Sequence, residues 1–184
     1  MSKSDAKVPL DHLRSMKKPV TKSVRISTDQ EVAERYQKAR SDCDLAKMAY
    51  ESNPRSEKNI SAYSEAKSSL EEAEDELREN SILFRFRSVG RRKYDELIKA
   101  HPITDEQREE AKAQNDGEDP GIEWNFETFP DALISECIVE PNISPAEMME
   151  WLQTDDWNTA EQQALFQAAF QANTMRSVVE MGKG

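Results

Sequence analysis

Side chains that commonly carry chemistry are few and scattered in this sequence. His12 and His101 are isolated, and neither has a cysteine, a second histidine or a pair of acidic residues at metal-ligand spacing. Cys43 and Cys137 are far apart, and no further cysteines suggest a disulfide framework. The acidic pair at 155–156 is of a kind that usually caps a helix or faces solvent. The sequence also lacks a glycine-rich phosphate loop and a nucleophile elbow, so we expect no metal, no cofactor and no enzymatic activity.

Length and composition favour a small, mainly α-helical protein. The 184 residues suffice for one domain or two small ones, and 33% of them are charged. Five glycines and eight prolines are too few for a β-rich or collagen-like chain, whereas abundant Ala, Glu, Gln and Lys favour helices. No apolar run approaches the roughly 20 residues of a membrane span, and the first residues lack the apolar stretch of a signal peptide. We expect a protein of a reducing cytoplasm that is neither exported nor embedded in a membrane.

The net charge of −11 is unevenly distributed along the chain. Residues 1–25 contain seven lysines and arginines and two acidic residues, whereas residues 102–184 contain four and eighteen. Nucleic-acid contacts need clustered cations, so the acidic body disfavours general nucleic-acid binding. The basic N-terminal segment leaves a DNA-binding role open as an alternative, although a solvated arm is the ordinary interpretation of such a charge run.

The segment 22–111 is predicted to be built around a helical hairpin. Residues 1–21 mix Lys, Ser and Pro without periodicity, which indicates a flexible basic tail, and 22–27 alternates like a short strand. From position 32 the apolar or small residues follow a heptad pattern, and after the break at 52–56 a second such pattern begins. The short connection implies an antiparallel pair whose seam is formed by Tyr36, Ala39, Cys43, Leu70 and Leu77, and we expect this seam to be buried.

The hairpin returns the chain to a second predicted strand. Residues 82–88 alternate with period two, and antiparallel pairing with 22–27 would form a two-stranded sheet. A short helix is expected over 91–102, and "TDEQ" at 104–107 matches the start of another. The acidic stretch 112–123 combines charge, Gly and Pro, and it is predicted to be a mobile linker.

The remainder, 124–184, is predicted to form a compact C-terminal helical domain. Pro130 suits the first turn of a helix with Thr128 as its cap, and apolar residues continue at one-face spacing to Ile138. "SPAE" at 144–147 and "TAEQ" at 159–162 begin two further helices. The fold class is therefore mainly α, with a helical hairpin, a small two-stranded β element and a helical C-terminal domain.

The second half of the chain resembles a known protein family. The order of "GRRKYDELIKAHPITDEQ", "WNFETFPDALISECIVEP", "ISPAEMMEWL" and "ALFQAAFQANT" is similar to that in tail assembly chaperones of long-tailed phages, or siphoviruses, that infect actinobacteria. The resemblance covers about half of the chain, from 84 to 174, and the specificity lies in the order of motifs that are individually weak. The chain departs from the family pattern in "FPDALIS", where the family often has a second proline, and in its polar turn "WLQTDDWNT".

The resemblance implies a chaperone that binds the tape measure protein and keeps it soluble until tail tube subunits polymerise around it. Its partners would be the tape measure protein, the tail tube protein and a frameshifted longer form of itself, in the host cell cytoplasm and outside the mature virion. Met181, Gly182 and Lys183 permit codons that fit a slippery frameshift site. Homo-oligomers remain open.

A tape measure segment exposes apolar helical faces, so its chaperone needs an apolar stripe or groove. We expect the partner-binding residues to be among the large C-terminal aromatics Trp151, Trp157, Phe166 and Phe170, whose alternative role is to fill the core. Two other functions stay open: a structural virion component of the head–tail connector or tail terminator, and a DNA-binding regulator that uses the basic residues of 85–93.

Overall fold

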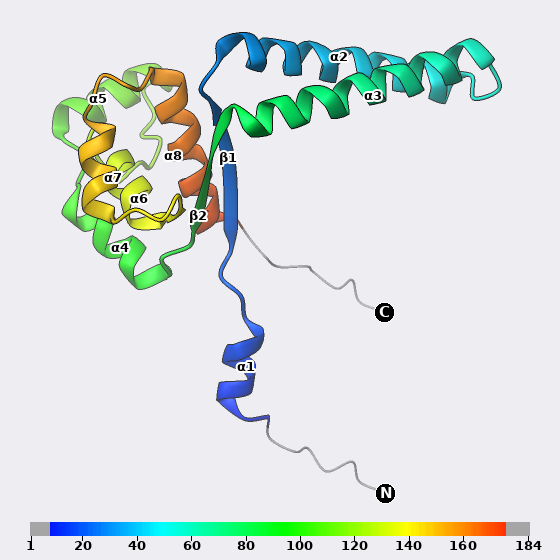
Figure 1. The fold of residues 1–184 in the computed structure, drawn as a ribbon. Helices are drawn as coiled ribbons and strands as arrows, with labels where there is room; N and C mark the ends of the chain where they lie inside the picture. The colour runs from blue at the N-terminus through cyan, green and yellow to red at the C-terminus, as the bar shows by residue number, and fades with distance from the viewer. Residues whose placement is uncertain (1–7, 176–184) are drawn as a thin grey trace, which may run out of the picture. The chain divides into compact units, whose positions relative to one another are not determined.

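The computed structural model describes residues 8–175 and places most of them in helices (Figure 1). In this part of the chain eight helices and three strands follow one another. The strands form one antiparallel sheet in the order β1-β2-β3. The predicted mainly α fold with a small β element is thereby confirmed, and the codons of 181–183 concern a segment outside the described residues.

The chain divides into two compact units. One comprises residues 25–84, and the other comprises the N-terminal segment up to Val24 together with the chain from Arg85 onward. This division differs from the predicted one, because residues on both sides of the expected linker at 112–123 belong to the same unit.

The first unit contains the predicted helical hairpin, formed by α2 (Gln30–Ser52) and α3 (Glu57–Glu79), which run side by side in opposite directions (Figure 1). The Asp29 carboxylate caps α2 by accepting hydrogen bonds from the first-turn amides, and the Ser56 hydroxyl does the same for α3. Pro54 lies in the connection, where its ring cannot disturb a helix.

The hairpin seam is much less buried than predicted. Of the predicted seam residues only Cys43 is buried, and the other four are half-buried. Val32 near the start of α2 is buried as well, whereas no residue of α3 is fully buried. Within the unit only two helices face each other, so side chains such as Leu70 and Leu77 are covered from one side. Ring stacking of Tyr50 on Tyr63, with 5.5 Å between centroids, adds to this thin interface.

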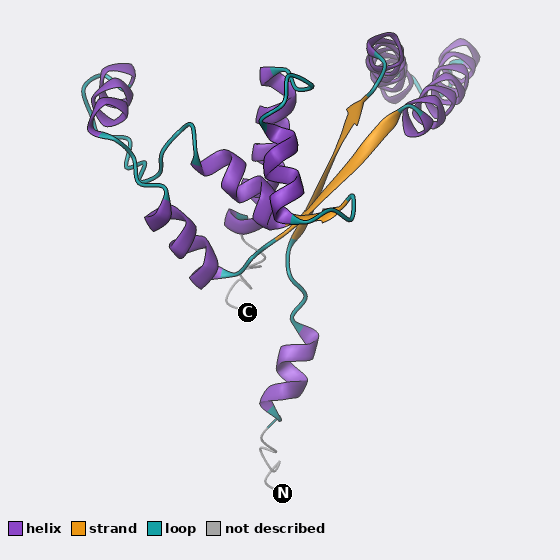
Figure 2. Cartoon of the chain, turned by 60° about the vertical axis from the view of Figure 1, so that its left-hand side comes forward, coloured by secondary structure: helices purple, strands orange, loops and turns teal. Residues whose placement is uncertain are grey.

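The sheet contains one strand that sequence periodicity did not predict (Figure 2). The strands β1 (Thr21–Ser27) and β2 (Ser81–Arg87) correspond to the two predicted ones, and β3 (Ile138–Glu140) occupies residues where the sequence continued a helical pattern. In β3, Glu140 lies opposite Arg85, and their charged groups form an ion pair of 3.1 Å. The helix before β3 therefore ends earlier than predicted.

A short helix, α1 (Leu10–Met16), lies in the segment that was expected to be a flexible tail. The expectation of no regular structure is wrong for these residues, although every one of them is exposed. The helical spacing of Leu10, Leu13 and Met16 covers only seven residues, and the prolines and lysines on either side made the segment look irregular in the sequence.

Five helices follow β2 in the second unit: α4 (Arg91–Ala100), α5 (Asp105–Gln114), α6 (Phe129–Cys137), α7 (Pro145–Leu152) and α8 (Thr159–Thr174). All five coincide with predicted helices. The predicted start at 144–147 is a complete capping box, and Asn158 forms a second one with Glu161 at the start of α8.

Thr128 occupies the N-cap position of α6, as predicted, but it does not cap the helix with its side chain. Its hydroxyl instead lies 3.0 Å from Nδ1 of His101. The side-chain oxygen of Asn125 accepts hydrogen bonds from the amides of Glu127 and Thr128, so an Asx turn leads the chain into the helix.

The expected linker at 112–123 is partly helical and is attached at several points. The helix α5 extends to Gln114, and Arg108 forms an ion pair of 3.8 Å with Asp119. After the linker, Trp124 forms a β-bridge with Pro102, and the amide of Asn125 donates to the carbonyl of His101. These bonds explain why the contacts place 85–184 in one unit.

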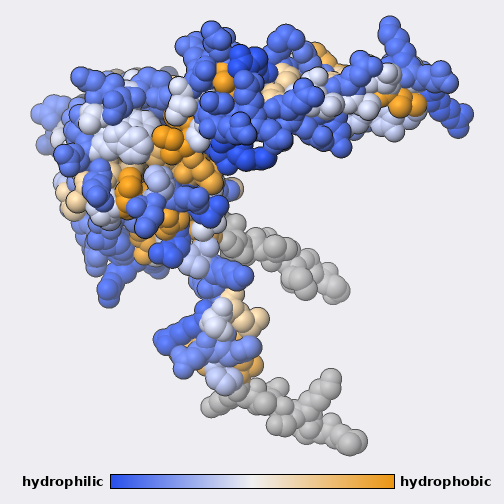
Figure 3. Space-filling view, in the orientation of Figure 1, coloured by the Kyte–Doolittle hydropathy of each residue, from blue (hydrophilic) through white to orange (hydrophobic). Residues whose placement is uncertain are grey.

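The core of the second unit is formed by one face each of the helices α4 to α8 and by β2 and β3. Asn173 connects its parts, because its side-chain oxygen accepts from the amide of Val89 and its amide nitrogen donates to Sγ of Cys137. In Figure 3 apolar residues gather on the visible face of this unit, whereas the surface of α2 and α3 is mostly hydrophilic. The largest fully buried side chains of the unit are Phe86, Phe129, Leu133, Ile134, Met148 and Leu165.

The half-buried seam lowers the expected effect of shortening Leu70. Leu-to-Ala changes at fully buried sites cost about 2–5 kcal/mol, so we expect Leu70→Ala to lower the free energy of unfolding by about 1–2 kcal/mol. Leu45→Ala, at a side chain that is 63% exposed on the same hairpin, is the matched control and should have little effect. Urea unfolding followed by circular dichroism tests this, and equal midpoints for the two variants would contradict the seam assignment.

Candidate helix-binding groove

The His, Cys and Asp side chains that could carry chemistry contact other side chains of the protein. His101 contacts Thr128, and the carboxylate of Asp156 accepts hydrogen bonds from the indole of Trp151 and the hydroxyl of Thr154. Burial raises the pKa of the Cys137 thiol to about 11, so the thiol stays protonated at neutral pH. Within residues 8–175 no three His, Cys, Asp or Glu side chains lie close enough together to hold a metal ion.

Trp151 and Trp157, two of the predicted partner-binding residues, form a pair where α7 leads into α8. Their ring centroids are 4.8 Å apart, and the indole nitrogen of Trp157 donates to the carbonyl of Trp151. Trp151 also donates to Asp156, so the pair closes the turn between the two helices. Both rings are half-buried, and this arrangement gives them a structural role in the turn.

Phe166 and Phe170 belong to a separate aromatic cluster with Trp124 and Phe129. The centroid of Trp124 is 5.4 Å from that of Phe166 and 5.0 Å from that of Phe129. Phe166 and Phe170 are 5.6 Å apart on successive turns of α8. The structure therefore divides the four predicted residues into two pairs, and only this second pair contacts Trp124 in a shared cluster.

An open groove lies along this cluster, with α6 on one side and α8 on the other. Its volume is about 410 Å³, and we call it the aromatic groove. Ile134, which is fully buried, lies at its base, and Trp124 and Phe166 are half-buried beside it. The complete lining consists of Trp124, Phe126, Glu127, Pro130, Asp131, Ile134, Thr159, Gln162, Gln163 and Phe166.

The local sequence explains how the groove is held open. The segment before α6 is fixed by Gln107, whose side-chain oxygen accepts from the amide of Phe126 and whose nitrogen lies 3.5 Å from the Asn125 oxygen. Pro130 occupies the first turn of α6, where no amide is needed for a helical hydrogen bond. On α8 the nitrogen of Gln162 donates to the carbonyl of Leu152, which ties the groove wall to the end of α7.

The polar edge of the groove is acidic. Glu127 is exposed in the segment before α6, and Asp131 is half-buried in the first turn of that helix. Burial raises the pKa of Asp131, while a hydrogen bond of 2.6 Å donated by Gln153 acts in the opposite direction. A ligand that brings a cation to this edge would stabilise the ionised carboxylate.

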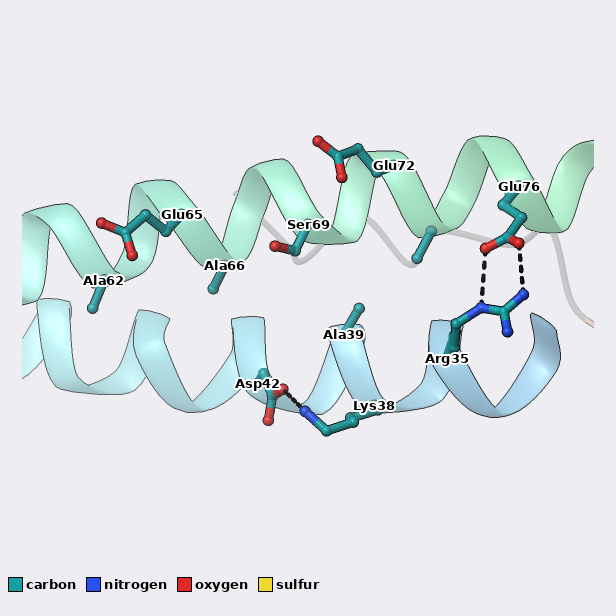
Figure 4. A pocket seen from close by; sticks show the side chains of 11 residues that line it. Arg35, Lys38, Ala39, Asp42, Ala62, Glu65, Ala66, Ser69, Glu72 and Glu76 are labelled. Atoms are coloured by element: carbon teal, nitrogen blue, oxygen red, sulfur yellow. Dashed lines mark hydrogen bonds and ion pairs between the residues drawn. The ribbon is translucent and has the colours of Figure 1, made fainter. Parts of the chain in front are cut away.

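A second groove runs along the hairpin between α2 and α3, with a volume of about 580 Å³ (Figure 4). Ala39, Ala62 and Ala66 point toward the facing helix, so its apolar surface consists of single methyl groups. At its rim Arg35 forms a two-pronged hydrogen-bonded pair with Glu76. The hairpin groove thus lacks large apolar side chains, and the aromatic groove is the better site for an apolar ligand.

Sequence reasoning found one residue of the aromatic groove and missed the rest. Phe166 was predicted and lines the groove, whereas Phe170 contacts the cluster but does not line it. Trp124, Phe126 and Ile134 line the groove and were not among the predicted partner-binding residues. The available signal was the high density of aromatic residues at 124–129, whose contacts with α8 depend on the tertiary fold.

Comparisons of this chain with protein family models, with curated proteins and with solved structures find no match. Between residues 8 and 175, none of the helices combines the length and apolar character that crossing a bilayer requires.

The raised pKa of Asp131 predicts a pH-dependent effect of Asp131→Asn. An acid with a folded-state pKa above its unfolded value destabilises the fold once it ionises, so this penalty appears as the pH rises through the raised pKa. We expect the melting temperature of the variant, relative to that of the unchanged protein, to be higher at pH 7 than at pH 3. An equal difference at both pH values would show that Asp131 ionises without a penalty.

Proposed function

We propose that this chain is a phage tail assembly chaperone that binds an apolar helical segment of the tape measure protein. The observation that carries the proposal is the aromatic groove, which is open and has the half-buried rings of Trp124, Phe126 and Phe166 as its apolar surface. The family resemblance of 84–174 supplies the identity of the partner, and all of the groove-lining residues lie within that range.

The groove favours an amphipathic helix as its ligand. Helix-binding grooves in proteins take apolar side chains from successive turns of a helix, and two flanking helices such as α6 and α8 form walls for this purpose. Glu127 and Asp131 favour a ligand helix that carries Lys or Arg beside its apolar stripe. Such a segment would associate with other copies if it were left exposed, so covering it would keep the partner soluble.

The charge of the chaperone itself supports this role. The chain carries a net charge of −11, and like-charged complexes repel one another in solution. We further propose, on the resemblance alone, that the protein acts in the host cell cytoplasm and releases the tape measure protein when tail tube subunits assemble. A frameshifted longer form of the chain would share the groove.

The DNA-binding alternative has less support, because four of the five cations of 85–93 lie in ion pairs, including Arg92 with Glu96. Arg85 pairs with Glu140, Lys93 with Glu136, and Arg91 with Asp95 on its own helix. Phosphate contacts would have to displace these carboxylates.

The test is co-expression with the tape measure protein and a variant that obstructs the groove. Gln163 is exposed and lines the groove, so Gln163→Arg adds a long side chain there without removing an aromatic contact. We expect it to abolish the increase in soluble tape measure protein that the unchanged chain gives. Phe166→Gln would be less informative, because Phe166 also packs against Trp124 and Phe129.

Gln171→Arg is the matched control, since it makes the same change at an exposed position on the same helix outside the groove. Helical content by circular dichroism should be unchanged in both variants. If the tape measure protein is equally soluble with and without the chain, the chaperone proposal is wrong. If the chain is found in stoichiometric amounts in purified virions, the structural alternative is favoured.

A further inference from the structure

We propose that the aromatic groove also binds α1 of a second copy of this chain, so that self-association and client binding compete for one site. The inference rests on the groove being the helix-binding site of the proposed function. It concerns a different ligand, however, and its test contains no client.

The apolar face of α1 has no cover within the described residues. Leu10, Leu13 and Met16 recur every third residue on one face, and they are 59%, 50% and 66% exposed. Side chains of this type and spacing are what a helix-binding groove takes up.

The helix α1 is short, so its helical state would be stabilised by packing against a partner. A helix of 7 residues is well below the roughly 12–15 residues at which isolated helices become even marginally stable in water. No residue of α1 is buried, so packing within its own unit does not stabilise it. Docking its apolar face would supply the missing stabilisation.

The charges of α1 and the groove are complementary. Lys17 and Lys18 directly follow the helix, and Arg14 lies within it, where it pairs with Asp11 at 3.4 Å. The groove edge carries Glu127 and Asp131, so the two lysines are the cations that a second copy would bring to it. This pairing is the one expected for the ligand helix of the proposed function, with Lys or Arg beside an apolar stripe. The interaction should therefore weaken as ionic strength rises.

Geometry within the unit favours a second copy over the chain's own α1. The carbonyl of Val20 accepts a hydrogen bond of 3.0 Å from the amide of Ser88, and Lys17 lines a depression together with Asn173 near the end of α8. From Asn173 back to Gln163 is about 15 Å along α8, whereas α1 spans only about 9 Å from first to last residue at the helical rise. Folded back on its own unit, α1 would end short of Gln163, so full occupation of the groove requires α1 from another copy.

Because α1 of a second copy and a client helix would occupy the same aromatic groove, the two would compete for it. With α1 of another copy in place, the groove would be shielded from solvent until a client helix displaced α1. Client binding would then separate the copies of the chaperone, and each binding event would weaken the other by the same factor.

The experiment is a complementation of two full-length variants, followed by sedimentation velocity over a range of concentrations. Leu13→Asp disrupts the α1 face and leaves the groove intact, and Gln163→Arg obstructs the groove and leaves α1 intact. We expect the unchanged chain to associate with increasing concentration, each variant alone to remain at the monomer mass of 21.1 kDa, and an equimolar mixture to form a mixed complex. If each copy of the unchanged dimer places its α1 in the groove of the other, the dimer has two such contacts. The mixed complex keeps only one intact α1 and one intact groove, so it should dissociate more readily than the unchanged dimer.

Ser15→Asp and Gln171→Arg are the matched controls, since they add the same charges to α1 and α8 away from the apolar face and the groove, and both should still associate. A monomeric unchanged chain, or a mixture that stays monomeric, overturns the proposal. Association that survives in Leu13→Asp overturns it as well, because the contact would then lie elsewhere. Self-association without any effect on tape measure solubility would support this inference while contradicting the proposed function.

Discussion

The packing of Trp124 against Phe129 and Phe166 is the interaction on which the second unit depends. The helices α6 and α7 have nine and eight residues, which is too short for independent stability, so their helical state relies on tertiary contacts. Trp124 supplies such contacts to α6 and α8 at once, with centroids 5.0 and 5.4 Å from those of Phe129 and Phe166. The same ring lines the aromatic groove, so the residue that holds the helices together also forms the surface proposed to bind a partner.

The two units solve the problem of solubility in different ways. The hairpin buries little and is covered with charged side chains, and its main stabilisation comes from a thin seam with exposed ion pairs that contribute little individually. The second unit concentrates its large apolar side chains in a core and leaves a limited apolar surface in one groove with an acidic edge. A protein that binds aggregation-prone helices needs both properties, namely a small apolar site and a strongly charged exterior.

The sequence predicted the helices well, because periodicity and capping are local properties. Ser144 with Glu147 marks the start of α7 in any tertiary context. It did not predict β3, because Ile138 and Val139 acquire strand geometry only by pairing with β2. It also did not predict how far Leu70 is buried, because that depends on how many layers of structure cover the hairpin seam. The groove was missed for the same reason: the aromatic residues of 124–129 were evident, but their position beside α8 is set by Gln107, Asn125 and the bridge at Pro102.

The central claim is that a helical partner occupies the aromatic groove, and site-specific photo-cross-linking tests it most directly. A small aliphatic diazirine side chain, no longer than that of glutamine and so unable to obstruct the groove, would replace Gln163 in the groove or Gln171 on the same helix outside it, in cells that also produce the tape measure protein. The account predicts a covalent product with the tape measure protein from position 163 and little from position 171. Equal yields from the two positions, or no product from position 163 while the tape measure protein stays soluble, would contradict it.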